Sequence, residues 1–199
     1  MALSAVQIGN MALSHIGHRS TIESFDEASA EAKQVKLWYD RARLEALEAF
    51  DWSFARKRQA LAAHTDDPPA GVWGYRYQYP ADCLRARYLV NPSGPDADLV
   101  PFEVETSPDG ATLSILTDLT EATLIYTFPQ ANVLLFSSLF VSALSHLLAY
   151  YVAFSITTKK AIKDQELLNF SNTVRVAAAG GANESASKPP REAPWVSGR

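Results

Sequence analysis

Cysteine is almost absent from this sequence, which limits the covalent and metal-bound frameworks that the chain can build. Of 199 residues only Cys83 is a cysteine, so a disulfide within the chain is excluded. A single thiol is typical of a protein that folds in a reducing compartment. With one cysteine, a zinc site would need carboxylates from several elements. We therefore expect neither a metal ion nor a cofactor.

Motifs of nucleotide binding and metalloprotease chemistry are missing as well. The sequence contains no GxxxxGK[ST], GxGxxG, HExxH or CxxC pattern. A basic surplus is also missing: the formal net charge is -4. Dedicated nucleic-acid binders usually carry an excess of lysine and arginine, so this charge argues mildly against that class.

Candidate catalytic side chains occur in contexts that favour other roles. Asp66 with Asp67, and Asp96 with Asp98, are paired acids of the kind that glycoside hydrolases use. Both pairs stand beside proline and glycine in loops, where we expect them to be solvated. Cys83 has small and apolar neighbours, which favours a core residue over a nucleophile. We therefore expect a protein without enzymatic activity.

What the sequence does contain is a long uncharged run at residues 133–158, without Asp, Glu, Lys or Arg. As a helix it would be roughly 39 Å long, enough to cross a bilayer. Its serines and His146, and the strand-like TLIYTF before it, favour a buried core or subunit-interface helix instead. A membrane anchor remains the alternative. We expect His146 to be a hydrogen-bonded residue of the core or the interface.

Apolar spacing predicts two helices before this run, at residues 3–16 and 27–50, and Ser24-x-x-Glu27 has the form of a capping box for the second. The second helix carries two apolar stripes. One stripe contains Val35, Trp38, Tyr39, Ala42, Ala46, Ala49 and Phe50, and the opposite one contains Leu37, Leu44 and Leu47. Two stripes indicate burial from two directions, inside a bundle or against a neighbouring subunit. We assign Leu37, Leu44 and Leu47 to the subunit interface.

The middle of the chain, residues 51–128, predicts a small antiparallel β-subdomain with an extended arm. Short alternating segments at 52–62, 73–80, 84–90, 101–106, 111–118 and 121–128 are separated by turn residues. A more polar helix at 160–178 and a flexible C-terminal tail at 180–199 follow the uncharged run. We therefore predict an α+β, mainly α fold: a helical bundle (1–50 and 129–179) with the β-subdomain inserted.

Two features of the β-subdomain have more than one interpretation. Arg56, Lys57 and Arg58 form a compact basic cluster, either a solvated strand edge or a contact for DNA phosphate or an acidic partner. The aromatic side of segment 73–80, from Trp73 to Tyr79, either packs the subdomain on the helices or stacks single-stranded bases. The scarcity of basic residues near it favours packing.

The polar tail contains one large apolar residue, Trp195, with Pro194 and Val196 beside it. A tryptophan without a local core is expected to anchor in a pocket on another protein. Residues 181–199 could extend roughly 60 Å, far enough to reach the portal or a neighbouring subunit.

Three stretches in order carry a resemblance to a known family. They are YDRARLEALEAFDWSFARKRQALA (39–62), WGYRYQYPADCLRARYL (73–89), and FEVE (102–105) with ILTD (115–118) and ATLIYTF (122–128). Together they resemble the tail tubular protein A-like adaptors, which connect head and tail in short-tailed bacteriophages (podophages). The similarity covers about residues 1–170, and the tail lies outside it.

The resemblance implies a structural role in the virion, at the head–tail junction. The expected assembly is a homo-oligomeric ring of twelve copies, built in the host cytoplasm, between the portal protein and the tail nozzle protein. Genomic DNA would pass through its channel without sequence-specific binding, and no membrane is involved. Members of related adaptor groups are linked to cell-wall hydrolysis, but this sequence offers no recognisable acid/base pair for that reaction. The two-striped helix and the uncharged helix suit contacts on both sides of a ring subunit.

Overall fold

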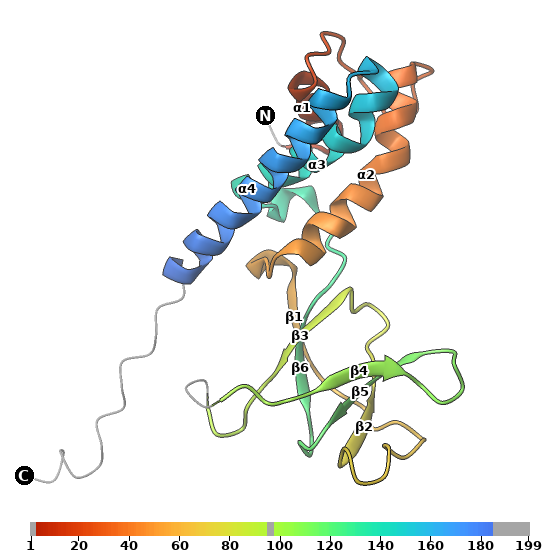
Figure 1. Cartoon of the computed structure of the whole chain (residues 1–199), viewed down its shortest axis with the longest axis vertical. Coiled ribbons are helices and arrows are strands. Elements are labelled where there is room, and N and C mark those ends of the chain that lie inside the picture. Colours follow the sequence, from red (N-terminus) through yellow and green to blue (C-terminus); the bar gives the residue numbers. More distant parts are fainter. Residues whose placement is uncertain (1–2, 95–97, 185–199) are drawn as a thin grey trace, which may run out of the picture.

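The helices of the chain form one half of an elongated molecule and the strands form the other half (Figure 1). The computed structural model describes residues 3–94 and 98–184, with side chains described up to Gly180. The helical half consists of α1 (Ala5–His15), α2 (Ala30–Ala49), α3 (Ser138–Thr157) and α4 (Lys160–Glu184). The strands lie between α2 and α3 in the sequence. The predicted α+β, mainly α fold with a small antiparallel β-subdomain is therefore confirmed.

Side-chain caps fix where the first two helices begin. At α1 the Ser4 hydroxyl accepts from the Gln7 backbone N–H at 3.2 Å, and the Gln7 amide oxygen accepts from the Ser4 N–H at 2.9 Å. This reciprocal pair is a capping box. The box predicted at Ser24 and Glu27 is wrong, because turns occupy that stretch and α2 begins at Ala30 behind the N-cap Ser29.

Helix α3 is the centre of the bundle and packs against α1, α2 and α4. Its fully buried leucines, Leu144, Leu147 and Leu148, form much of the core. Thr158 adopts the left-handed conformation that ends the helix and turns the chain back into α4. By length and composition alone α3 could span a membrane, but 56% of its most apolar window is buried inside the protein. This burial favours a core helix.

The β-subdomain contains two antiparallel sheets of three strands. One sheet has the order β1 (Arg56–Ala60), β6 (Thr123–Thr127) and β3 (Arg85–Leu89). The other has the order β2 (Tyr75–Gln78), β5 (Leu113–Thr117) and β4 (Glu103–Thr106). A second apolar core lies here, separate from that of the helices. Its buried members are Tyr77, Leu89, Ile115, Ala122, Leu124 and Tyr126.

The aromatic segment 73–80 is covered differently from the prediction. Tyr77 is buried in the core of the β-subdomain instead of packing on the helices, while Tyr75 is exposed. The opposite side of β2 is also covered, because Arg76 is buried. Arg76 Nη2 donates to Glu105 Oε1 at 2.6 Å, and Nη1 donates to Ser114 Oγ at 2.7 Å. An ion pair across the sheet thus joins β2 to β4, on the far side of β5.

Two arginines hold the junction between the halves. Arg43 on α2 donates to the carbonyl oxygen of Gln130 at 2.7 Å, which fixes the segment leading back to the bundle. Arg87 on β3 donates to three carbonyl oxygens at the end of α2, those of Leu47, Glu48 and Phe50. The last carbonyls of a helix lack partners within the helix, and a cation there also complements the helix dipole.

At the C-terminal side, α4 continues beyond the predicted end of the helical region. Residues 180–184, assigned to the flexible tail by their composition, are helical. The remaining tail residues, including Pro194, Trp195 and Val196, lie outside the described residues.

Candidate functional site

Three polar side chains from three helices meet on one side of the bundle. His15 is the last residue of α1, His146 lies in the middle of α3, and Glu166 lies in the second turn of α4. The imidazole rings of His15 and His146 are stacked, with centroids 4.2 Å apart and planes inclined by 22°. The Nδ1 atom of His146 is 2.7 Å from Glu166 Oε2. We call these three residues the histidine–glutamate cluster.

Hydrogen bonds assign the protons of both imidazoles. The Ser145 hydroxyl donates to the Ser142 carbonyl oxygen at 2.9 Å, so it accepts from His15 Nε2 at 3.1 Å. An ionised Glu166 only accepts, so His146 donates to it through Nδ1. In the neutral rings the lone pairs are therefore on His15 Nδ1 and His146 Nε2.

The carboxylate of the cluster is buried and held from a second side. Glu166 is only 5% exposed, and its Oε1 accepts from the amide of Asn169 at 3.1 Å. Asn169 in turn accepts from the amide of Gln165 at 3.0 Å. Burial, together with the neighbouring His146, lowers the pKa of His15, although the Glu166 carboxylate acts in the opposite direction. The neutral imidazole of His15 is therefore favoured at neutral pH.

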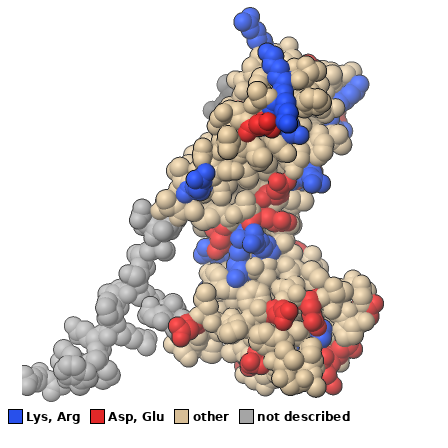
Figure 2. Space-filling model, in the orientation of Figure 1, with Lys and Arg blue, Asp and Glu red and all other residues tan. Residues whose placement is uncertain are grey.

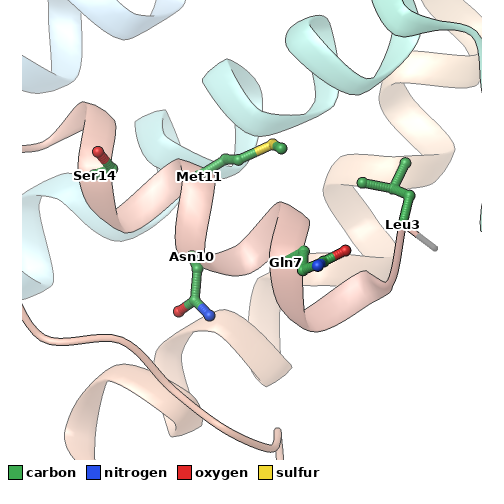
Figure 3. Close-up of a pocket in the computed structure, with 5 residues that line it drawn as sticks. All are labelled: Leu3, Gln7, Asn10, Met11 and Ser14. Carbon is green, nitrogen blue, oxygen red and sulfur yellow. The ribbon is translucent and has the colours of Figure 1, made fainter. Parts of the chain in front are cut away.

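A pocket of about 410 Å³ opens next to the cluster, and both histidines contribute to its wall. Ser142 and Ser145 supply hydroxyls, and Met11 and Phe136 supply apolar surface. A second pocket, of about 510 Å³, follows the outer side of α1 (Figure 3). Leu3 and Met11 line both pockets. The cluster is thus accessible from a surface depression.

One local feature of the sequence indicates a buried acidic residue at this cluster. Ile162, Glu166 and Phe170 follow one another at four-residue spacing on α4, and all three face the bundle. An acidic residue within such a stripe indicates a buried partner. The pairing of His15 with His146 has no such local signal, because the stacking of the two rings depends on how α1 packs against α3.

The basic cluster is mostly neutralised within the chain. Arg56 forms an ion pair with Asp51 at 2.8 Å, and Lys57 forms one with Asp82 at 2.5 Å. Among the described residues Arg58 alone of the three has no acidic partner. Figure 2 shows lysine and arginine side chains next to aspartate and glutamate side chains at the narrow junction between the two halves. This arrangement favours the solvated strand edge over a phosphate-binding patch.

The second stripe of α2 is only partly available to a neighbour. Leu37 is 65% exposed, and Leu44 is half-buried. Leu47 is fully buried in the core of its own subunit, so its assignment to a subunit interface is wrong. The turn of the helix brings Leu47 under the β-subdomain junction, where Arg87 contacts its carbonyl oxygen. His146 is occupied by Glu166 and His15 within the chain.

The candidate catalytic side chains lie in environments that suit other roles. Asp66 and Asp67 are exposed in their loop. Asp98 is also exposed, whereas Asp96 lies outside the described residues. Burial raises the pKa of the Cys83 thiol to about 11, so the thiolate needed for nucleophilic attack is scarce at neutral pH. Among the members of this set that the structure describes, none has the paired environments of a glycosidase or a cysteine nucleophile.

Large apolar side chains remain exposed on both flanks of the bundle. On α2 the exposed residue is Leu37, and on α4 they are Leu167, Leu168 and Val176. Helix α3 lies between α2 and α4 (Figure 1). The two sets of exposed side chains therefore belong to helices on different sides of α3.

Comparison with known proteins adds no family assignment. No protein-family model matches this sequence, and no curated protein matches it.

Proposed function

We propose that this protein is a structural subunit of a ring, the head-to-tail adaptor of a short-tailed bacteriophage. The observation that carries the proposal is the exposed apolar surface on two flanks: Leu37 on α2 is 65% exposed, and Leu168 on α4 is 57% exposed. Adjoining exposed apolar side chains are typical of contact surfaces, and on α4 Leu168 is next to the exposed Leu167 in the sequence. The resemblance of three ordered sequence stretches to phage adaptors supplies the biological setting.

The arrangement of the flanks suits a ring better than a two-fold dimer. In a ring each subunit uses two different surfaces, one toward each neighbour, and the contact repeats until the rotation closes. A two-fold dimer requires one self-complementary surface. In this chain α2 and α4 each provide an exposed leucine from opposite sides of α3. The family resemblance suggests twelve copies.

The portal protein and the tail nozzle protein are the proposed partners at the two ends of the elongated subunit. Genomic DNA would pass through the central channel. A net charge of -4 suits this passage, because a strongly basic channel would hold phosphates and retard the DNA. Ion pairing of Arg56 and Lys57 is consistent with the absence of strong DNA binding.

A membrane anchor built on α3 is the second candidate. The length and composition of α3 support it. Its packing against three other helices speaks for the core role, since insertion into a bilayer would strip the helix of those contacts. Fractionation of expressing cells separates the two: an adaptor stays in the soluble fraction, and an anchor requires detergent.

The test of the adaptor is particle mass. Light scattering and negative-stain microscopy of the untagged protein, alone and mixed with the cognate portal, should reveal ring-sized particles. A protein that remains monomeric in both samples contradicts the proposal.

A further inference from the structure

We propose that His15, His146 and Glu166 bind a divalent transition-metal ion of the zinc class. The proposal is independent of the adaptor function, because all three ligands belong to one subunit. It replaces the expectation from sequence that no metal is held.

The first support is convergence. His15, His146 and Glu166 each offer one ligand atom, and these atoms all lie within 4.8 Å of one another. A tetrahedral zinc ion with bonds of about 2.0–2.2 Å brings its ligands to about 3.5 Å from one another. Small rotations of the side chains close the difference. His15 can provide them, because it is exposed and ends its helix.

The second support is the chemistry of the donors. Two imidazoles with a carboxylate favour zinc and its transition-metal neighbours, whereas magnesium and calcium prefer oxygen ligands throughout. Ligand binding requires neutral imidazoles and an ionised carboxylate. The bond that His15 Nε2 donates to Ser145 leaves a lone pair on His15 Nδ1. On His146 the ion would take the place of the Nδ1 proton that bonds Glu166, and that proton would move to Nε2, so the ring stays neutral.

The third support is the shell behind the ligands. Metal-binding carboxylates and histidines are commonly oriented by further hydrogen bonds. Here Asn169 donates to Glu166 at 3.1 Å, and Gln165 donates to Asn169 at 3.0 Å. Ser145 bonds His15 at 3.1 Å. These contacts orient Glu166 on α4 and His15 on α1 before an ion arrives.

Three protein ligands leave a fourth position for water in a tetrahedral site. The pocket beside the histidines, with the hydroxyls of Ser142 and Ser145 in its wall, provides room for that water. The bound ion would join α1, α3 and α4, so its main effect on this protein is to stiffen the bundle.

The experiment titrates untagged full-length protein, stripped with chelator, with zinc chloride. Calorimetry should give saturable binding of one ion per chain. Melting in zinc at a hundredfold excess over the dissociation constant should occur about 5 °C or more above the stripped protein. Cobalt should give the absorption bands of a tetrahedral site, and magnesium should change neither signal.

Three variants locate the ion. His15→Gln and Glu166→Gln keep the size of each side chain and should each weaken zinc binding at least tenfold. His18→Gln is the control variant. His18 lies beyond Gly17, and its Nε2 atom is 3.0 Å from Glu31 Oε1. Its replacement should leave zinc binding unchanged. Absence of saturable binding by the wild type overturns the proposal. Equal weakening by His18→Gln, or unchanged binding in His15→Gln, also overturns it, because the ion then lies elsewhere.

Discussion

The guanidinium of Arg87, on β3, donates a hydrogen bond of 2.7 Å to the backbone carbonyl oxygen of Phe50, the residue that caps the C-terminus of α2. The same group reaches the carbonyl oxygens of Leu47 and Glu48 at 3.1 Å. Its Nε donates to Thr127 Oγ1 at 2.8 Å. One side chain of the β-subdomain therefore completes the C-terminal end of α2. The two halves are coupled through it.

Replacing Arg87 should destabilise the whole chain. Hydrogen bonds from a charged donor contribute about 1.5–3 kcal/mol each, and loss of several from a half-buried group leaves helix carbonyls without partners. For Arg87→Ala we expect the free energy of unfolding to fall by about 2–4 kcal/mol. Urea denaturation followed by circular dichroism measures it.

Two further variants separate geometry from charge at this position. Arg87→Lys keeps the charge but lacks the planar fork, so it should recover less than half of the loss. Arg58→Ala removes an exposed arginine on β1 and should change stability by less than about 0.5 kcal/mol. If Arg87→Ala leaves the free energy of unfolding unchanged, the junction does not depend on the hydrogen bonds from Arg87 to the end of α2.

Gly9 of α1 lies against Val35 of α2. A methyl group placed on Gly9 would lie 2.8 Å from Val35 Cγ1, which is inside van der Waals contact. Alanine gains about 1 kcal/mol of helix propensity over glycine, but overpacking a core costs about 1–3 kcal/mol. We expect Gly9→Ala to lower the free energy of unfolding by about 1 kcal/mol, measured by thermal or urea denaturation.

The matched control is Gly180→Ala on α4. A methyl group there meets nothing within 4 Å, so only the propensity acts, and stability should rise by up to about 1 kcal/mol. If both substitutions stabilise the chain, α1 and α2 are not packed as closely as Gly9 and Val35 indicate.

Much of the fold followed from the sequence because its signals are local. The period-two alternation around Tyr77 and Ile125 predicts strands, and the uncharged run around Leu144 predicts a core helix. The boundaries of the helices were harder to predict from the sequence. Ser24 and Glu27 have the spacing of a capping box, yet Ser29 starts α2, because turns hold the preceding segment.

The candidate site could not be predicted in the same way. His15 and His146 are 131 residues apart, and their stacking depends on the packing of α1 against α3. Leu47 is a second residue whose surroundings depend on tertiary packing. Its position on the second stripe of α2 predicted a subunit contact, but the β-subdomain junction and the bundle core cover it. Periodicity identifies a buried face without identifying what buries it.

Asp82 gives the β-subdomain a pH dependence at acidic pH. Hydrogen bonds from Lys57 and then Tyr126 hold the pKa of Asp82 below its ordinary value of 3.8. A carboxyl whose pKa is lower in the folded state stabilises the fold above its unfolded value, and this contribution disappears as pH falls through the folded value. Because the Asp82 side chain is 43% exposed, we expect less than about 1 kcal/mol.

The measurement compares the unfolding free energies of wild type and Asp82→Asn at about pH 5 and about pH 3. The gap between them should be present at the higher pH and shrink at the lower one. Asp67→Asn is the control, because the Asp67 carboxylate is exposed and forms no ion pair within the described residues. A gap that stays constant with pH would show that Asp82 acts only through packing.

The last prediction tests whether the two apolar flanks meet in a ring. Leu37→Asp and Leu168→Asp each place a charge on one flank, where burial against an apolar partner is unfavourable. If the α2 flank of one subunit contacts the α4 flank of the next, each variant alone loses every contact and should be monomeric by light scattering. An equimolar mixture should form dimers and stop there, because the intact α4 flank of Leu37→Asp fits the intact α2 flank of Leu168→Asp, and both outer flanks are blocked. Leu99→Asp, an exposed leucine on the β-subdomain, should still form rings. If the mixture of variants forms rings, these two flanks do not contact each other. The same conclusion follows if the mixture stays monomeric while the wild-type protein forms rings.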